Sequence, residues 1–333
     1  MEDRFTVKKA GTQRKNVLLR YKKGTYMNPD LNVAVLGIGL MGYPMAKQLC
    51  QAGYRVHAWN RSAAKAERLV PFGATVHDSA AAAAKHADIV ITMLESGPVV
   101  DAVLFGDGAT TQGAASALRR GALVIDMSSI KPREAKEHAA RLAAGGLDYL
   151  DAPVSGGTVG AEAATLAIMA GGSAADFERA LPLLLTMGRA THVGPVGSGQ
   201  LAKLANQMIV GITIGAVAEA LLLCEKGGAD PAMVRKAISG GFAESRVLQV
   251  HGERMVEHDF APRARMTVQL KDLRNALDTA ASLQFDAPVT ALFAQLFADG
   301  VSHGLGELDH AGLFVELARR NALLPAGFGD KGK

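Results

Sequence analysis

Three polar residues near the middle of the chain interrupt a long apolar stretch. Lys203, Asn206 and Gln207 are spaced at i, i+3 and i+4, so a helix would place all three on one face. The surrounding residues 201–224 contain no proline and are apolar on nearly every side, which is typical of a helix that is buried all round. A lysine there either exchanges a proton with a substrate, because burial lowers the pKa of an ammonium, or extends its ammonium into water from the helix end. The stretch by itself favours the second interpretation.

A glycine-rich turn lies nearer the N-terminus, between a strand and a helix. Residues 31–36 are predicted to form a buried strand, residues 43–52 a helix and residues 54–59 the next strand. A turn with the pattern GxGxxG in this setting is the fingerprint of a dinucleotide-binding fold, because the second glycine lets the main chain approach a pyrophosphate. The helix N-terminus adds free N–H groups for the phosphates. We therefore predict that a dinucleotide binds at Gly37, Ile38, Gly39, Leu40, Met41 and Gly42.

The residues after the second strand indicate which nicotinamide cofactor binds. An acidic residue there would hold the ribose hydroxyls of NAD, but this chain has Asn60, Arg61 and Ser62, with no carboxylate before Glu67. A guanidinium beside two neutral hydrogen-bonding side chains suits a phosphomonoester. NADP is therefore predicted as the cofactor, with NAD as the alternative if Arg61 is only a solvated residue at a helix start.

Strands and helices continue to alternate after these residues. Strands are predicted at 88–93, 121–126, 149–152, 165–172 and 190–193, and helices at 79–85, 98–105, 132–144 and 173–185. Because a ligand of an open parallel sheet lies beyond the carboxyl ends of the strands, Met93, Leu94 and Ser129 are predicted beside the cofactor. Residues 153–157, which include Ser155, Gly156 and Gly157, break the alternation. They are predicted to form a loop that holds a carboxylate through its hydroxyl and N–H groups.

The C-terminal part of the chain is predicted to be helical throughout. Helices are expected at 231–239, 246–257, 266–284, 288–300 and 310–320.

The predicted fold is a Rossmann-type α/β domain with a mostly parallel sheet, followed by an all-α domain joined through a long interdomain helix. The predicted divisions are a basic extension (1–30), the Rossmann domain (31–194), the long helix (195–226), the helical domain (227–325) and a tail (326–333). Exposed apolar helix faces predict a homodimer or homotetramer through the helical domain, and the histidines show no metal-ligand spacing.

The composition excludes several classes of protein. The chain has 333 residues, 49% of them hydrophobic and 20% charged, which is typical of a globular protein with two domains. Of the net charge of +4, residues 1–26 contribute +6, so the remainder carries −2 and has no nucleic-acid or membrane footprint. No apolar run is expected to be long enough to span a bilayer. Two cysteines, Cys50 and Cys224, provide no disulfide framework, which favours the cytoplasm. Residues 1–26 are interpreted as an extension before a start at Met27, with a basic arm or a targeting segment as the alternatives.

Four separated motifs resemble the β-hydroxyacid dehydrogenase family over about residues 31 to 320. They are Gly37–Ala46, Asp151–Gly157, Gly197–Asn206 and Leu270–Leu273. The resemblance implies that Lys203 is the catalytic general acid and base, aided by Asn206, and that Ser129 and the loop 155–157 bind the substrate carboxylate. It also implies that Lys271 reaches the nicotinamide, whereas the residues alone allow an ion pair of Lys271 with Asp272. The Asn-Arg-Ser triplet is similar to that of NADP-preferring members.

Departures from the family pattern leave the substrate open. Ala164 replaces a usual glycine, Gln207 a common second asparagine, and Glu95 a usual proline. The predicted reaction is hydride transfer between the nicotinamide and a short β-hydroxyacid or semialdehyde acid, of the 3-hydroxyisobutyrate or tartronate semialdehyde type. The alternatives are a glyoxylate or succinic semialdehyde reductase, an imine reductase, and a non-catalytic NADP-binding sensor or scaffold. Retention of Lys203 disfavours the last two, since imine-reducing relatives lack that lysine and a sensor has no use for a proton donor.

Overall fold

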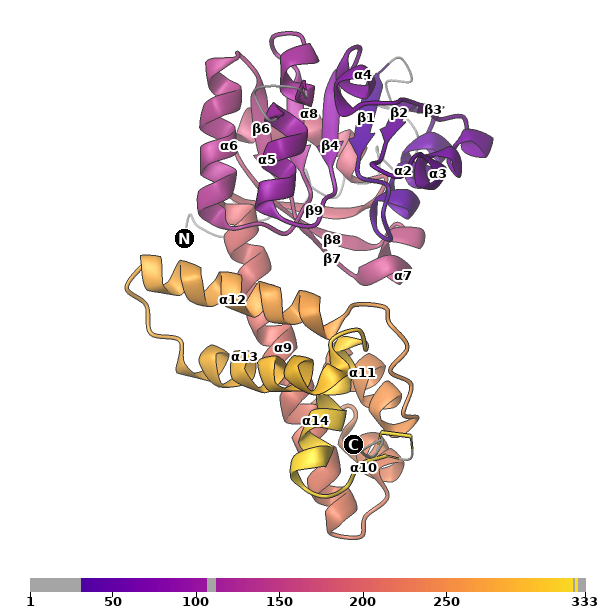
Figure 1. The fold of residues 1–333 in the computed structure, drawn as a ribbon, viewed down its shortest axis with the longest axis vertical. Coiled ribbons are helices and arrows are strands. Elements are labelled where there is room, and N and C mark those ends of the chain that lie inside the picture. The colour runs from indigo at the N-terminus through magenta and orange to yellow at the C-terminus, as the bar shows by residue number, and fades with distance from the viewer. Residues whose placement is uncertain (1–30, 107–111, 326, 329–333) are drawn as a thin grey trace, which may run out of the picture. The chain divides into compact units, whose positions relative to one another are not determined.

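The computed structural model describes residues 31–106, 112–325 and 327–328 (Figure 1). The chain divides into two compact units between Leu201 and Ala202. The basic extension predicted at 1–30 lies outside the described residues, as do residue 326 and residues 329–333 of the predicted tail. The division falls inside one continuous helix, α9 (Ser198–Lys226), whose first turn belongs to the N-terminal unit.

Among the described residues, the N-terminal unit is built on a sheet of nine strands. They are β1 (Asn32–Leu36), β2 (Arg55–Trp59), β3 (Thr75–Val76), β4 (Ile89–Thr92), β5 (Leu123–Asp126), β6 (Asp148–Asp151), β7 (Val154–Ser155), β8 (Leu166–Gly171) and β9 (Gly188–Gly194). The strand order is β3-β2-β1-β4-β5-β6-β8-β7, and β9 pairs with β8. The pairs from β3 to β6 are parallel, whereas β8 runs antiparallel to β6 and β7. The prediction of a mostly parallel Rossmann-type sheet is therefore confirmed.

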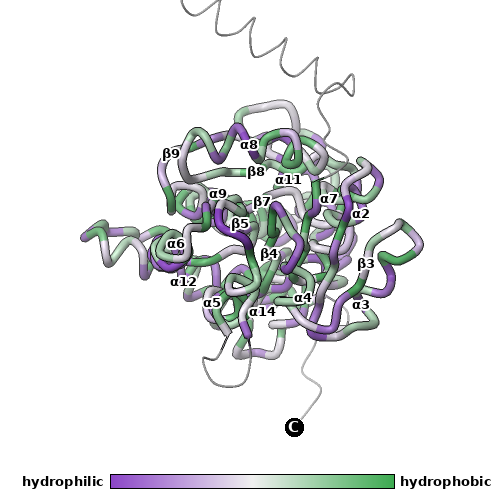
Figure 2. The backbone as a smooth tube through the Cα atoms, turned by 90° about the horizontal axis from the view of Figure 1, so that it is seen from above, coloured by the Kyte–Doolittle hydropathy of each residue, from purple (hydrophilic) through white to green (hydrophobic). Residues whose placement is uncertain are grey.

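Helices cover both faces of this sheet (Figure 1). They are α2 (Gly42–Gln51), α3 (Ala63–Glu67), α4 (Ala80–Ala84), α5 (Gly97–Phe105), α6 (Pro132–Ala144), α7 (Gly157–Glu162) and α8 (Ala174–Leu184), with 3-10 turns at Val70–Phe72 and Ala114–Ala117. In β1, Val33 and Val35 belong to one hydrophobic core, and Ala34 and Leu36 to the core on the other face. Because both faces are buried, the central strands are mostly apolar, as the colouring of β4 shows (Figure 2).

The predicted loop at 153–157 is wrong in part. Val154 and Ser155 form the short strand β7, which pairs antiparallel with Ile168 and Ala167 of β8, and α7 begins directly at Gly157. The short elements α3 and β3 were also not expected. A strand of two residues and helices of five or six are too short to show a periodicity in the sequence.

The C-terminal unit is helical, as predicted. Besides the rest of α9, it contains α10 (Pro231–Ile238), α11 (Arg246–Val256), α12 (Met266–Ser282), α13 (Pro288–Gly300) and α14 (Leu313–Arg320), with a π-helical turn at Val301–Leu305 and a 3-10 turn at His310–Gly312. Its core joins α9 residues such as Ile214 to α12, α13 and α14. The glycines of α9 make room for neighbours, because a Cβ at Gly211 would lie 2.6 Å from the Gln269 amide and one at Gly215 would collide with the Phe293 ring.

Helix α9 is less buried than expected. Leu201, Ile209 and Leu223 are 48%, 67% and 73% exposed, so the prediction of a helix buried all round is wrong. Within the described residues α9 is also long and apolar enough to cross a membrane, a criterion that core helices of soluble proteins meet too. The expectation that no apolar segment is long enough to span a bilayer is therefore wrong, judged by the length and composition of α9.

Candidate active site

The glycine-rich turn joins β1 to α2, and its three glycines have different reasons to be glycine. Gly37 has a φ of +106°, and a Cβ there would collide with the Met93 carbonyl and lie 2.8 Å from the Leu94 side chain. A Cβ at Gly42 would collide with the carbonyl of Gly37. By contrast, a Cβ at Gly39 would meet nothing within 4 Å. Gly37 and Gly42 therefore keep the turn tight, whereas Gly39 leaves an open approach to the main chain.

The residues after β2 divide into one that holds the turn and two that remain exposed. Asn60 accepts a hydrogen bond from the Ile38 N–H (2.9 Å) and donates one to the Ser62 carbonyl (3.0 Å). Arg61 and Ser62 are exposed. Asn60, which the sequence assigned to the cofactor directly, thus also fixes the glycine-rich turn. The N-terminus of α2 has no side-chain cap from Met41, so its first N–H groups suit the phosphates of a dinucleotide.

The ends of β4 and β5 are joined by a buried polar network. The Leu94 N–H donates to the Ser128 hydroxyl (2.9 Å), and the Ser128 N–H donates to Asp126 (3.0 Å). The same carboxylate oxygen accepts a hydrogen bond from the Thr92 hydroxyl (2.8 Å). Burial raises the pKa of Asp126, against the hydrogen bonds from Ser128 and Thr92. The network brings the segments of Leu94 and Ser129 to one edge of the sheet, where the sequence predicted them.

The predicted carboxylate loop lies at the end of β7. Ser155 is half-buried, and Gly156 and Gly157 are exposed with φ values of +136° and +61°. A Cβ at Gly157 would meet nothing within 4 Å. These positive φ values explain why two glycines follow Ser155. The exposure of both glycines leaves the main chain of the loop accessible to a ligand.

Lys203 lies in the helical unit and is held by a side-chain amide. Its Nζ donates to Gln207 Oε1 (3.0 Å), which also accepts a hydrogen bond from the Asn206 amide (2.9 Å). The other end of the Gln207 amide donates to the buried Asp272 carboxylate (2.6 Å). The Gln269 side-chain amide in turn donates to the main-chain carbonyl of Gln207 (3.0 Å). The face predicted from the i, i+3, i+4 spacing is therefore one hydrogen-bonded group.

The surroundings of Lys203 favour its neutral form more than water does. Burial lowers the pKa of Lys203, the nearby Asp272 opposes this shift, and Lys271 adds to it. A lysine with a lowered pKa changes its protonation state more readily near neutral pH, which a general acid and base must do.

Lys271 is joined to the same group of side chains. Its Nζ lies 3.2 Å from the Asp272 carboxylate, so the ion pair that the sequence allowed is formed. Asp272 thus contacts both Lys271 and Gln207 through different oxygens. The role of Asp272 was not predicted, although it lies in the Leu270–Leu273 motif, and neither was that of Gln269.

Sequence spacing also gave no sign of a cluster formed by His251, Asp309 and His310. Ligand atoms of the three side chains lie within 4.8 Å of one another. However, Arg254 donates to Asp309 Oδ1 (3.0 Å), and the N–H of Ala264 donates to Oδ2 (3.1 Å). The cation of this cluster is thus the Arg254 guanidinium. Burial lowers the pKa of His310 to about 3, so that imidazole stays neutral beside it.

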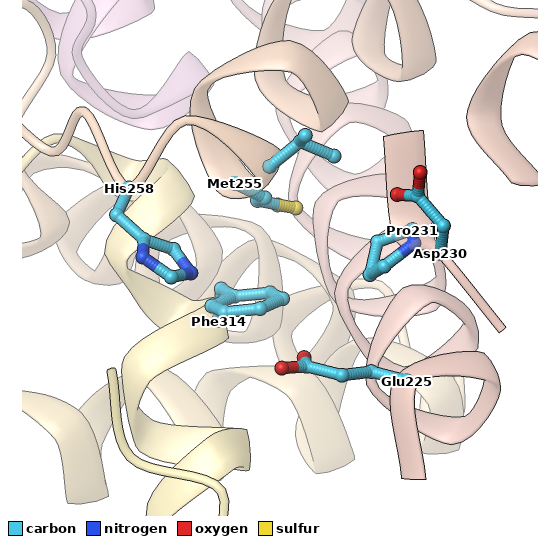
Figure 3. Close-up of a pocket in the computed structure, with 7 residues that line it drawn as sticks. Glu225, Asp230, Pro231, Met255, His258 and Phe314 are labelled. Atoms are coloured by element: carbon cyan, nitrogen blue, oxygen red, sulfur yellow. The ribbon is translucent and has the colours of Figure 1, made fainter. Parts of the chain in front are cut away.

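A separate pocket of about 170 Å³ lies in the helical unit. Its lining residues are Glu225, Asp230, Pro231, Met255, Val256, His258 and Phe314 (Figure 3). None of them is a predicted site residue, and the volume is below the range of about 300–1,000 Å³ that is usual for small-molecule sites. The pocket is therefore not a candidate for the substrate.

Two family models match successive parts of the chain. The family model of the NAD binding domain of 6-phosphogluconate dehydrogenase matches residues 32–197. A second model, described as NAD-binding of NADP-dependent 3-hydroxyisobutyrate dehydrogenase, matches residues 197–317. The two models meet at Gly197, at the start of the motif that carries Lys203.

Individual relatives match over nearly their whole length. The chain is 43% identical to 2-hydroxy-3-oxopropionate reductase of Escherichia coli K12 over 288 residues, which is 86% of this chain and 97% of the relative. It is 37% identical to 3-hydroxyisobutyrate dehydrogenase of Pseudomonas aeruginosa over 290 residues, with coverages of 85% and 95%. The solved structure of Mycobacterium tuberculosis 3-hydroxyisobutyrate dehydrogenase with L-serine has a TM-score of 0.78 and 33% identity, covering 86% of this chain and 98% of that one.

Fold, motifs and relatives thus lead to one assignment. The glycine-rich turn lies at the end of the first strand of a Rossmann-type sheet, and the helical unit matches the corresponding unit of hydroxyacid dehydrogenases. The chain therefore belongs to the β-hydroxyacid dehydrogenase family and is an NAD(P)-dependent hydroxyacid dehydrogenase.

Proposed function

We propose that this enzyme interconverts a short semialdehyde acid and its β-hydroxyacid with NADP, and that Lys203 is the general acid and base. The observation that carries the proposal is the position of the Lys203 amine, which donates to Gln207 and has a pKa lowered by burial. The printed names of the relatives support substrates of the 2-hydroxy-3-oxopropionate and 3-hydroxyisobutyrate type.

The proposed reaction needs one proton and one hydride. The nicotinamide, when bound, supplies the hydride to the aldehyde carbon. The carbonyl π bond breaks as the C–H bond forms, and its oxygen takes the electron pair. Lys203, as the ammonium, donates a proton to that oxygen, and in the oxidative direction its neutral amine removes the hydroxyl proton. Asn206 orients the substrate or the lysine without adding charge.

The substrate carboxylate is assigned to the Rossmann unit. Ser129 and the residues Ser155, Gly156 and Gly157 offer hydroxyl and N–H donors, and the two glycines are exposed. Residues 31–194 would thus hold the cofactor and substrate, the long helix at 195–226 would supply the acid–base group, and the helical domain at 227–325 would contribute Lys271 to the nicotinamide side.

The preference for NADP rests on the exposed Arg61 and Ser62. No carboxylate follows β2 before Glu67, and Arg61 lies beyond the end of β2 with an exposed side chain. Arg61→Ala is expected to raise KM for NADPH about 10-fold or more and to leave KM for NADH nearly unchanged. Equal effects on the two cofactors in steady-state kinetics would contradict the preference.

The decisive experiment measures NADPH oxidation with a panel of carbonyl acids. The panel contains tartronate semialdehyde, methylmalonate semialdehyde, glyoxylate and succinic semialdehyde, with a keto acid plus amine to detect imine reduction. Lys203→Met is expected to lower kcat by about two to four orders of magnitude with little change in NADPH affinity. The control is Lys226→Met, in the last turn of the same helix, where the ammonium donates to the Asn321 carbonyl.

The panel also decides between the alternatives. Turnover by Lys203→Met at the wild-type rate would remove the acid–base role. Amine formation would instead favour an imine reductase, and NADPH binding without turnover of any compound would favour a sensor or scaffold.

The quaternary structure and location are part of the same proposal. We infer a cytoplasmic homodimer or homotetramer that pairs through the helical unit and binds no nucleic acid or membrane. Four apolar side chains in this unit are more than half exposed. Leu283 and Phe285 follow the end of α12, and Val289 and Leu292 lie on α13. Light scattering coupled to size exclusion tests this, and a monomer at micromolar concentration would contradict it.

A further inference from the structure

The first turn of α9 is held by a buried carboxylate. Asp151 ends β6 and is fully buried. Its Oδ1 accepts a hydrogen bond from the Gly197 N–H (2.7 Å), and its Oδ2 accepts one from the Gln200 N–H (2.8 Å). A carboxylate that accepts the free N–H groups at a helix start fixes both the position and the direction of that start.

The side chain of Gln200 brackets one residue of the loop after β5. Its Oε1 accepts a hydrogen bond from the Ile130 N–H (3.1 Å), and its Nε2 donates to the Ser128 carbonyl (2.8 Å). Gln200 is fully buried, and Ser129 lies between the two main-chain groups that it binds. The Gln200 amide thus binds the carbonyl before Ser129 and the N–H after it. Only a side chain that both donates and accepts hydrogen bonds can do this.

Two glycines allow α9 to approach β6 and β8 closely enough for these bonds. A Cβ at Gly199 would collide with the Met169 carbonyl and lie 2.8 Å from the Asp151 carboxylate. A Cβ at Gly171 would lie 2.6 Å from the Gly199 nitrogen. The glycine between Ser198 and Gln200 is therefore required by packing on Asp151, a role that the sequence did not indicate.

We propose that Gln200 is a positioning residue for the substrate, because its amide fixes the main chain on both sides of Ser129. Asp151, in turn, fixes the helical turn that carries Gln200. This inference rests on the proposed function, in which Ser129 binds the substrate carboxylate. It assigns a second task to the helix that carries Lys203. The first turn sets the substrate-binding loop, and the residues that follow supply the acid–base group.

The test replaces Gln200 by methionine, which has a similar length but neither hydrogen-bonding group. Gln200→Met is expected to raise KM for the semialdehyde acid about 10-fold and to change kcat less than about 3-fold. The control is Gln48→Met, because Gln48 also donates to a distant main-chain carbonyl in this unit, that of Glu162, and lies on α2. The control is expected to keep the wild-type KM.

A second variant separates positioning from packing. The protonated side chain of Gln200→Glu can donate to the Ser128 carbonyl and accept from the Ile130 N–H, whereas the ionised form cannot donate. The ratio of its KM to that of the wild type, measured at the same pH, is expected to be near 1 at pH 5 and never to fall as the pH rises. A ratio at pH 5 as high as that of Gln200→Met would overturn the proposal.

Amide hydrogen exchange provides a readout that does not depend on turnover. The Ile130 amide is expected to exchange at least 10-fold faster in Gln200→Met than in the wild type or in Gln48→Met. Wild-type exchange together with a wild-type KM would overturn the positioning role. Failure of the proposed function has another signature, since Lys203→Met would then keep full activity or no carbonyl acid would be reduced, whatever the exchange rate at Ile130.

Discussion

Near the expected site, burial shifts the pKa of two carboxylates in the Rossmann unit and of an amine and an imidazole in the helical unit, which also buries the carboxylate of Asp272. Burial raises the pKa of Asp126 and takes that of Asp151 to about 7. In the helical unit, burial lowers the pKa of Lys203, and it takes that of His310 to about 3. In both units the shift is toward the neutral form, because each charge has lost water.

The partners of these groups differ more than the shifts do. Asp151 accepts N–H groups of the main chain, so its bonds fix a turn of helix in place. Lys203 instead donates to the side chain of Gln207, which Asp272 holds from the other end. Main-chain partners suit a group that anchors structure. A side-chain partner suits a group that gains and loses a proton, because the amide oxygen of Gln207 accepts from both the ammonium and the amine.

The largest expected effect on stability follows from removing Asp309, the ion-pair partner of Arg254 in the helical unit. Asp309→Ala leaves the Arg254 guanidinium, which is 17% exposed, without its carboxylate. Breaking a buried ion pair from one side costs about 3–5 kcal/mol, because the remaining charge stays buried. Urea unfolding followed by circular dichroism measures this loss. Glu307→Ala, which removes an exposed pair with Arg265, is the control and should leave the midpoint unchanged.

The next largest effect on stability is expected where the first turn of α9 packs on Asp151 in the Rossmann unit. Gly199→Ala forces a methyl group against the Met169 carbonyl and the Asp151 carboxylate, so α9 must move away from the sheet. Such overpacking costs about 1–3 kcal/mol. Gly39→Ala is the matched change, because its Cβ meets nothing within 4 Å. It is expected to keep wild-type stability in the same unfolding assay but to weaken NADPH binding. Equal stability of the two variants would show that α9 is not tightly packed on Asp151.

The pH dependence of stability should have opposite signs in the two units. The folded pKa of His310 lies below its unfolded value of about 6.5, so its contribution is present above pH 6.5 and is lost as the pH falls. The folded pKa of Asp151 lies above its unfolded value, so its contribution is present below about pH 4 and is lost as the pH rises to about 7. Each slope is about 1.4 kcal/mol per pH unit within its window.

Two neutral variants measure these slopes between pH 5 and pH 8. Relative to the wild type, His310→Gln should be most favourable at pH 5, and Asp151→Asn most favourable at pH 8. Free energies of unfolding from urea titrations at each pH provide the comparison. Parallel curves for the two variants would contradict the opposite pH dependences expected of His310 and Asp151.

The smallest expected effect is a displacement of the pH profile of turnover. Asp272 raises the pKa of Lys203 against burial, so Asp272→Asn should lower that pKa further. The ammonium is then lost at lower pH, and the alkaline decline of the reduction rate should move to lower pH. The acidic limb of the oxidation rate should move the same way. Asp278→Asn, six residues further along α12, is the control, and an unshifted profile in Asp272→Asn would separate Asp272 from Lys203.

Local features of the chain predicted much of this protein. The turn of Gly37 to Gly42 was recognisable because strand, turn and helix follow one another within about thirty residues, and each is set by neighbouring residues. The long helix predicted at 195–226 extends over 198–226, since its apolar run continues over many turns. The face shared by Lys203, Asn206 and Gln207 follows from helix geometry alone.

Tertiary structure alone decided what these residues contact. The hydrogen bond from Ile130 to Gln200 spans 70 positions, that from Gln207 to Asp272 spans 65, and that from Arg254 to Asp309 spans 55. No periodicity links such positions, because the contacts exist only once the sheet and the helices have packed. Burial, and with it the pKa of Asp151, Lys203 and His310, is likewise a property of the packed chain, since water is removed by residues far away in the sequence.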